Sequence, residues 1–468
     1  MNYYVRKIRN NSRLRSVKIE RDFTSGPLLK QILLFSIPLM FTNILQILFN
    51  TADVLVLGAL VGDTAVAAVG STGSLINLLT ALVIGISIGV NVVASKHLGA
   101  NNEQGVQKVI GMSILLSVIF GAVLLLIGWF GANFFLTLMK SDVEVIGLST
   151  TYLKVYFLGV PLVVLYNFLS AIMRAAGDSK RPLIYLAISG VVNVLLNVFF
   201  ILVLNMTVEG VAIATVVSQG LSALLCLIQL IRAKGLVKLK AKYIGFYKKE
   251  LLEIIKIGFP SGVQSSLFSL SNVFIQSTIN MCGKLAMAGS SYAVQIEAYV
   301  YSPMHSVALG LMTFISQNYG AKKIDRIHKT ILYSLILAVS VGFTLGAIGT
   351  LISKPLLSLF AEDYEVVNYA YRRMLFVCLP YCLCGIMDVL SSTMRALGKS
   401  VTSMIICLIG SCLLRIIWVN VMFALFPSYD LIFVSYPATW IITSIVLALV
   451  LFPMLKKIKT RFEIELGA

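Results

Sequence analysis

Charged residues are scarce in this chain of 468 residues. Asp, Glu, Lys and Arg together make up 12% of the sequence, whereas soluble globular proteins carry about 25%. Hydrophobic residues make up 58%, and the mean hydropathy is +0.91. This composition excludes a soluble globular domain and indicates an integral membrane protein.

Motifs for nucleotide and metal chemistry are also missing. The sequence contains no G-x-x-x-x-G-K-[ST] phosphate loop and no H-E-x-x-H zinc motif. The seven cysteines do not have zinc-ligand spacing with any of the three histidines, so we interpret them as small apolar residues. An ATP-driven pump and a membrane-embedded enzyme are therefore disfavoured, and no cofactor is expected.

Long apolar runs are what the chain has in abundance. Each run meets or exceeds the roughly 20 residues that a helix needs to cross a bilayer. The sequence therefore predicts an all-α integral membrane protein with twelve transmembrane helices, near residues 31–60, 64–95, 109–137, 150–173, 182–205, 208–231, 254–281, 285–317, 330–352, 366–394, 401–426 and 431–455.

The basic residues are distributed unequally between the two sides of these spans. With the N-terminus inside, 31 of the 38 Lys and Arg fall in cytoplasmic segments and six in outer loops, and only Arg415 lies inside a span. This bias predicts a multi-pass protein of the plasma membrane with both termini cytoplasmic. The formal charge of +18 then indicates contact with anionic membrane lipids, and nucleic acid is not expected as a partner.

The second half of the sequence repeats the first at a shift of about 221 residues. Asn50 corresponds to Asn272, and M-R-A-A-G at 173–177 corresponds to M-R-A-L-G at 394–398. Six spans per half make the repeats parallel, so we expect two lobes around a central cavity, as in an alternating-access transporter. The expected divisions are an N-terminal tail (1–27), an N-lobe (28–231), a linker (232–253), a C-lobe (254–455) and a C-terminal tail (456–468), in a monomer.

Three acidic residues lie well inside the predicted spans: Asp53, Glu297 and Asp388. An ionised carboxylate at the centre of a membrane helix costs roughly 2.5–3.5 kcal/mol on insertion scales, so each is a candidate for coupling to a cation. A carboxylate can carry H⁺, or bind Na⁺ if further oxygen ligands lie nearby, and the sequence leaves both open. The alternative is a purely structural ion pair.

Arg415 is predicted to supply that ion pair, with Asp388 or Glu297, because an unpaired charge inside the membrane is costly. Whether this ion pair breaks and re-forms during function (a switch) or only stabilises the fold (a brace) stays open. Arg174 and Arg395, at the inner ends of the fourth and tenth spans, are interpreted as interfacial anchors or helix-end partners rather than as substrate ligands. Uncharged polar residues are expected to line the cavity: Gln46, Asn50, Asn167, Asn193, Asn197, Asn272, Gln276, Tyr292 and Gln295.

The order of short motifs resembles that of the multidrug and toxic compound extrusion (MATE) family, over about residues 28–457. The motifs are N-T-A-D-V-L-V-L-G at 50–58, K-H-L-G-A at 96–100, Q-N-Y-G-A at 317–321 and the duplicated M-R-A-x-G. The resemblance, nearest to the bacterial DinF-like and NorM-like branch, implies an antiporter that exports organic, often cationic, compounds against inward H⁺ or Na⁺ flow. Asn197 stands where many relatives have Asp, which puts coupling through an N-lobe carboxylate pair in doubt.

Two other functions compete with drug export. A flippase for lipid-linked oligosaccharides, from a related superfamily, would favour a markedly cationic cavity. A non-transporting membrane scaffold would not account for matched lobes or for three carboxylates within spans. A major-facilitator transporter is disfavoured because its basic loop after the second span is missing.

Overall fold

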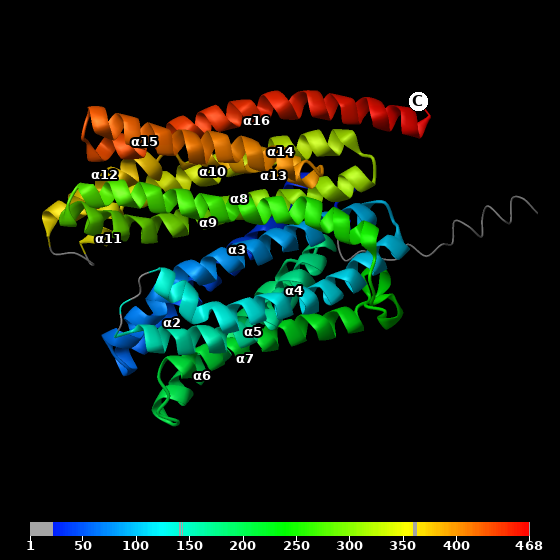
Figure 1. Cartoon of the computed structure of the whole chain (residues 1–468). Helices are drawn as coiled ribbons and strands as arrows, with labels where there is room; N and C mark the ends of the chain where they lie inside the picture. Colours follow the sequence, from blue (N-terminus) through cyan, green and yellow to red (C-terminus); the bar gives the residue numbers. More distant parts are fainter. Residues whose placement is uncertain (1–21, 140–141, 143, 359–362, 468) are drawn as a thin grey trace, which may run out of the picture.

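The computed structural model describes residues 22–139, 142, 144–358 and 363–467, and the first 21 residues of the expected N-terminal tail lie outside these ranges. The described chain is helical (Figure 1). The longer helices are α2 (Leu28–Leu60), α3 (Asp63–Gly99), α4 (Glu103–Leu138), α5 (Ile146–Ala175), α6 (Lys180–Leu202), α7 (Val208–Arg232), α8 (Lys248–Met281), α9 (Lys284–Gly320), α10 (Ile324–Leu351), α12 (Tyr364–Val377), α13 (Tyr381–Ala396), α14 (Ser400–Cys407), α15 (Leu414–Leu425) and α16 (Tyr429–Leu466).

Nine helical stretches in the described residues are long and apolar enough to cross a membrane, and α12 with α13 forms a tenth span bent by 46°. The two other predicted spans correspond to α8 and α9. These helices contain 34 and 37 residues, long enough to cross a membrane, but they are too polar to be recognised by hydropathy alone. In the eleventh span, a π-helical turn at Leu408–Leu413 joins α14 to α15. Twelve spans therefore result, as the sequence predicts.

The helices form two groups, α2–α7 and α8–α16, which lie side by side in Figure 1. The repeat is visible in the backbone: Gly177 and Gly398, the last residues of the two M-R-A-x-G motifs, have φ angles of 85° and 84°. Only glycine adopts this left-handed conformation at no steric cost, and it ends a helix there. The duplicated sequence thus encodes duplicated helix ends.

The lobes meet at the end of the bundle that contains the start of α2 and the end of α16, and their ribbons diverge toward the other end (Figure 1). The backbones of α3 and α8 approach closely, where Gly85 and Gly89 face Gly258, Gly262 and the Ile254 carbonyl. A Cβ atom at either α3 glycine would overlap the α8 backbone. Small residues of this kind allow membrane helices to touch along their backbones.

Hydrogen bonds between the lobes reinforce the closed end. Gln317 Nε2 donates to the Ala175 carbonyl at 2.7 Å, and Thr313 Oγ1 donates to Asn91 Oδ1 at 3.1 Å. Gln317 Oε1 also accepts from the Phe23 backbone N–H at 3.1 Å. These three hydrogen bonds would have to break for the lobes to separate at this end.

The predicted C-terminal tail continues α16 as far as Leu466. Its end is attached to the body of the C-lobe, because Lys322 Nζ lies 3.0 Å from Glu465 Oε2. Residues 456–466 are therefore an ordered extension of the last span beyond its apolar part.

Gly89→Val is expected to disturb the closed state. The added side chain would overlap the Ile254 carbonyl, and overpacking of this kind costs about 1–3 kcal/mol. The ratio of closed to open molecules should fall about tenfold, since 1.4 kcal/mol corresponds to a factor of ten. Electron–electron resonance between spin labels at Gln104 and Lys329, in a cysteine-free background, should show longer distances.

Gly70→Val is the matched control for that experiment. It makes the same change in the same helix, but no atom lies within 4 Å of the added Cβ. Its label distances should equal those of the parent. Equal distances in the Gly89 variant would show that the glycine contact does not hold this end closed.

Candidate transport site

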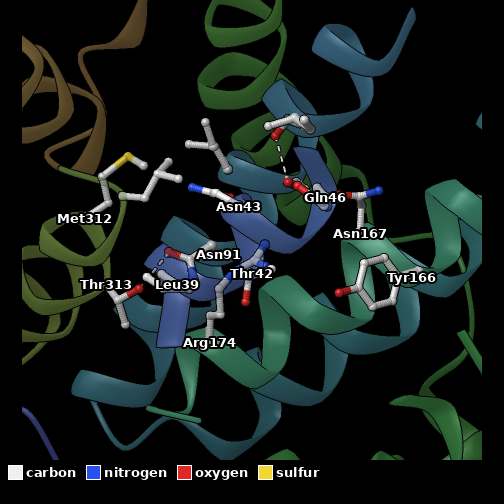
Figure 2. A pocket seen from close by; sticks show the side chains of 14 residues that line it. Leu39, Thr42, Asn43, Gln46, Asn91, Tyr166, Asn167, Arg174, Met312 and Thr313 are labelled. Atoms are coloured by element: carbon white, nitrogen blue, oxygen red, sulfur yellow. Dashed lines mark hydrogen bonds between the residues drawn. The ribbon is translucent and has the colours of Figure 1, made fainter. Parts of the chain in front are cut away.

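A central cavity of about 90 Å³ lies between the lobes. It is lined by α2, α3 and α5 of the first lobe and by α9 of the second (Figure 2). The polar lining consists mostly of amides and hydroxyls, with apolar residues between them. The lining residues are Leu39, Thr42, Asn43, Gln46, Ile84, Ser87, Ile88, Asn91, Tyr166, Asn167, Arg174, Leu309, Met312 and Thr313.

Arg174 is the one charged residue among those that line this cavity, and no carboxylate lies there. Figure 2 shows its side chain rising from α5 toward Thr42 and Asn91. The interpretation of Arg174 as an interfacial anchor is therefore wrong: the arginine faces the space between the lobes. Arg174 lies near the end of its helix in the sequence, which suggested an interfacial position. A long side chain on a helix points back toward the N-terminus, however, and here it reaches the cavity.

Asp53 lies in a separate polar site within the N-lobe. Asn197 Nδ2 donates to Asp53 Oδ1 at 2.6 Å, and it also lies 3.4 Å from Asn193 Oδ1. The Thr215 hydroxyl accepts a hydrogen bond from Asn193 at 3.4 Å. The site borders a cavity of about 50 Å³ that is lined by Phe49, Asn50, Asp53, Leu186, Ser189, Gly190, Asn193, Thr215, Ser218 and Gln219.

The partners of Asp53 in the described chain are neutral. No Lys, Arg or His lies within ion-pair distance of it among those residues. The Asn197 Oδ1 atom is buried without a hydrogen-bond partner. An uncompensated carboxylate beside amide and hydroxyl oxygens is a donor set that suits H⁺ or a hard cation such as Na⁺.

Asp388 occupies a polar cluster in the C-lobe. His305 Nδ1 lies 2.9 Å from Asp388 Oδ2, and the Tyr301 hydroxyl donates to the same oxygen at 3.1 Å. Tyr301 and His305 are one turn apart on α9, with a 3.0 Å contact between them. The i, i+4 spacing of Tyr301 and His305 places both side chains on one helix face.

Glu297 forms a buried ion pair with Arg373. The guanidinium donates to both carboxylate oxygens, at 2.6 and 2.9 Å, and to Ser290 Oγ at 2.6 Å. The expectation that Arg415 alone among the basic residues lies inside a span is wrong, since Arg373 belongs to α12 and is 5% exposed. The broken tenth span begins earlier than its apolar core and carries this arginine into the lobe.

The predicted pairing of Arg415 with Asp388 or Glu297 is wrong. Arg415 donates to Thr439 Oγ1 at 3.0 Å, and its guanidinium carbon lies 4.0 Å from the Tyr436 ring centroid and 5.9 Å from that of Trp440. Aromatic faces stabilise a cation when a carboxylate is out of reach. The aromatic residues of α16, which carried no prediction, thus supply the environment that an ion pair was expected to give.

The remaining polar candidates are dispersed. Gln46 and Asn167 line the central cavity, as expected from the sequence. Asn272 is exposed on α8, and Gln276 donates to Asn280 of the same helix at 3.0 Å, so neither lines that cavity. Tyr292 and Gln295 border a largely apolar hollow of about 440 Å³ beside α10.

Comparison of the sequence with known protein families identifies a match in each repeat. The MatE family model matches residues 38–199 and 260–421, one copy in each repeat. The chain belongs to the MatE family. The MatE match confirms the resemblance that the motifs indicated, together with the all-helical fold of twelve spans in two repeats.

Relatives of this MatE chain are similar over most of their length. It is 30% identical over 372 residues to the protein named "Probable multidrug resistance protein YoeA" of Bacillus subtilis, covering 78% of this chain and 80% of that one. It is 28% identical over 398 residues to "Probable multidrug resistance protein YpnP" of the same organism, covering 84% and 88%. A solved outward-facing MATE transporter superposes with a TM-score of 0.87 at 21% identity, covering 94% and 98%.

Proposed function

We propose that this MatE chain is a secondary active antiporter that exports organic compounds by alternating access. One observation carries the proposal: a span carboxylate, Asp53, is held by neutral partners in one lobe, while a separate cavity lies between the lobes. The cation that drives transport and the compound that is exported would thus bind at separate sites. The names of the relatives, which refer to multidrug resistance, agree with this assignment.

Sidedness follows from the distribution of charge. The linker that joins α7 to α8, rich in lysine, lies at the closed end of the lobes, and basic loops favour the cytoplasm. We therefore assign the closed end to the cytoplasm and the conformation to an outward-facing state, in a plasma-membrane monomer. Lysine and arginine at that end would contact anionic lipids.

The coupling ion is proposed to be H⁺ or Na⁺, bound at Asp53 or at the Asp388 cluster. Glu297 is a weaker candidate than the sequence suggested, because Arg373 already compensates its charge. One elementary charge moving through 100 mV releases about 2.3 kcal/mol, which supports roughly a 50-fold substrate gradient at 1.4 kcal/mol per tenfold. The two carboxylates could also attract organic cations, the substrates that the family resemblance implies.

Export from proteoliposomes tests the proposal. Liposomes containing the full chain and a fluorescent organic cation would receive a pH gradient or a Na⁺ gradient in separate experiments. We expect one gradient to drive uphill movement of the dye, and empty liposomes to show none. Dye movement that is independent of both the pH gradient and the Na⁺ gradient would contradict cation-coupled antiport. Lipid-linked oligosaccharides would then be the next substrates to test.

A further inference from the structure

Arg174 is a cation without a compensating anion. Among the described residues, no carboxylate lies within 4.0 Å of its guanidinium, and no hydrogen bond to a protein acceptor is formed. The residue is half-buried, on the wall of the cavity between the lobes. An unpaired charge that is partly removed from water is costly, so the site is incomplete without an anionic partner.

The second repeat gives its equivalent arginine a hydrogen-bond partner. Arg395 donates to Ser391 Oγ at 2.9 Å within the C-lobe, and Asp388 lies seven residues before it on the same helix. In the first repeat, the residue seven positions before Arg174 is Asn167. Arg174 lines the shared cavity, and no such hydrogen bond joins it to another described residue.

We infer that the central cavity binds an acidic group of the exported compound, a carboxylate or similar monoanion, on Arg174. The inference rests on the proposed function, because it names the class of compound that the exporter accepts. Thr42 and Asn91 supply neutral polar groups near the guanidinium, and Asn167 lines the same cavity farther along α5 (Figure 2). The substrates are then acidic or zwitterionic compounds with an apolar body.

The size and charge of the cavity limit the acid. A volume of about 90 Å³ is smaller than the roughly 300–1,000 Å³ of pockets that bury a drug-sized ligand. The cavity therefore takes the acidic group and the ring that bears it, and the rest of the compound lies toward the open end. Arg174 is the one cationic residue of the cavity lining, so it matches a ligand group with a single negative charge. A pyrophosphate carries more negative charge and would require additional cationic residues.

A matched pair of dyes tests the inference. The first is a zwitterionic rhodamine with a free carboxylate on its pendant phenyl ring, and the second is its methyl ester, a cation. Fluorescence anisotropy with the detergent-solubilised full chain measures the two dissociation constants without any gradient. The wild type should bind the carboxylate dye more tightly than the ester.

Arg174→Gln should weaken binding of the carboxylate dye by about tenfold or more, since a charge-assisted hydrogen bond contributes about that factor. Binding of the ester should change by less than about twofold, which also shows that the variant is folded. Arg232→Gln is the matched control. It removes the same charge from an exposed position at the end of α7 and should change neither constant.

Asn167→Asp is the independent variant, because it copies the acid of the second repeat into the first. The new carboxylate should compensate Arg174 and reduce the preference for the carboxylate dye by a similar factor. Equal affinities for the two dyes in the wild type would overturn the inference, as would equal losses for both dyes in Arg174→Gln with no change in Asn167→Asp. Gradient-driven export of the ester would survive that failure, so the proposed function is tested separately.

Discussion

Asp53→Asn is expected to reduce gradient-driven export to the level of empty liposomes. The substitution keeps the size of the side chain and its ability to accept from Asn197 Nδ2, 2.6 Å away in the parent, but it removes the carboxylate that we propose binds H⁺ or Na⁺. Downhill exchange of substrate, which needs no coupling ion, should persist. Comparing uphill efflux with downhill exchange in the same proteoliposomes measures the difference.

Asp63→Asn is the matched control for Asp53, because Asp63 lies exposed in the first turn of α3. It should export at the parental rate. Asp388→Asn, tested alongside, shows whether the C-lobe cluster contributes. Full uphill export by the Asp53 variant would move coupling to Asp388, and loss of downhill exchange would point to a structural role for Asp53.

Arg373→Met is expected to destabilise the protein by about 3–5 kcal/mol, because it leaves the Glu297 carboxylate buried and unpaired. The two side chains are only 7% and 8% exposed, so water cannot replace the lost guanidinium. Thermal unfolding in detergent should show a large fall in melting temperature. The double variant Glu297→Gln with Arg373→Met should recover most of it, since no charge then remains.

The neighbouring arginine provides the control. Arg372 forms an ion pair of 2.6 Å with Asp430, but these side chains are 35% and 32% exposed. Exposed pairs contribute about 1 kcal/mol or less, so Arg372→Met should change the melting temperature little. An equally small change in Arg373→Met would show that Glu297 does not depend on the pair. Parental export by the double variant would establish Glu297 and Arg373 as a brace.

The sequence was a good guide to the fold because membrane physics leaves few choices. A run of about 20 apolar residues must form a helix in lipid, where each backbone group needs an internal partner. The repeat then follows from matched motifs, such as the two that end at Gly177 and Gly398. The break between α12 and α13 and the π-helical turn were not predicted, since each depends on packing within a span.

The site was harder to predict, because ion pairs depend on which helix faces meet. Asp53 and Asn197 are 144 residues apart in the sequence, yet a 2.6 Å hydrogen bond joins them. Arg415 was predicted to form an ion pair with a carboxylate because an unpaired charge inside the membrane is costly. The structure instead gives Arg373 the carboxylate and Arg415 the Tyr436 ring, a choice that a single sequence does not encode locally.

The glycine contact between α3 and α8 also has a mechanical meaning. Gly85, which faces the Gly262 backbone, divides α3 into arms of about 33 Å toward Asp63 and about 21 Å toward Gly99, at 1.5 Å per residue. If the lobes rock about this fulcrum, a given rotation opens the inner mouth only about two-thirds as wide as the outer one. With the closed end on the cytoplasmic side, as proposed above, the entrance is then the narrower aperture, and it would limit the size of the compound before the exit does.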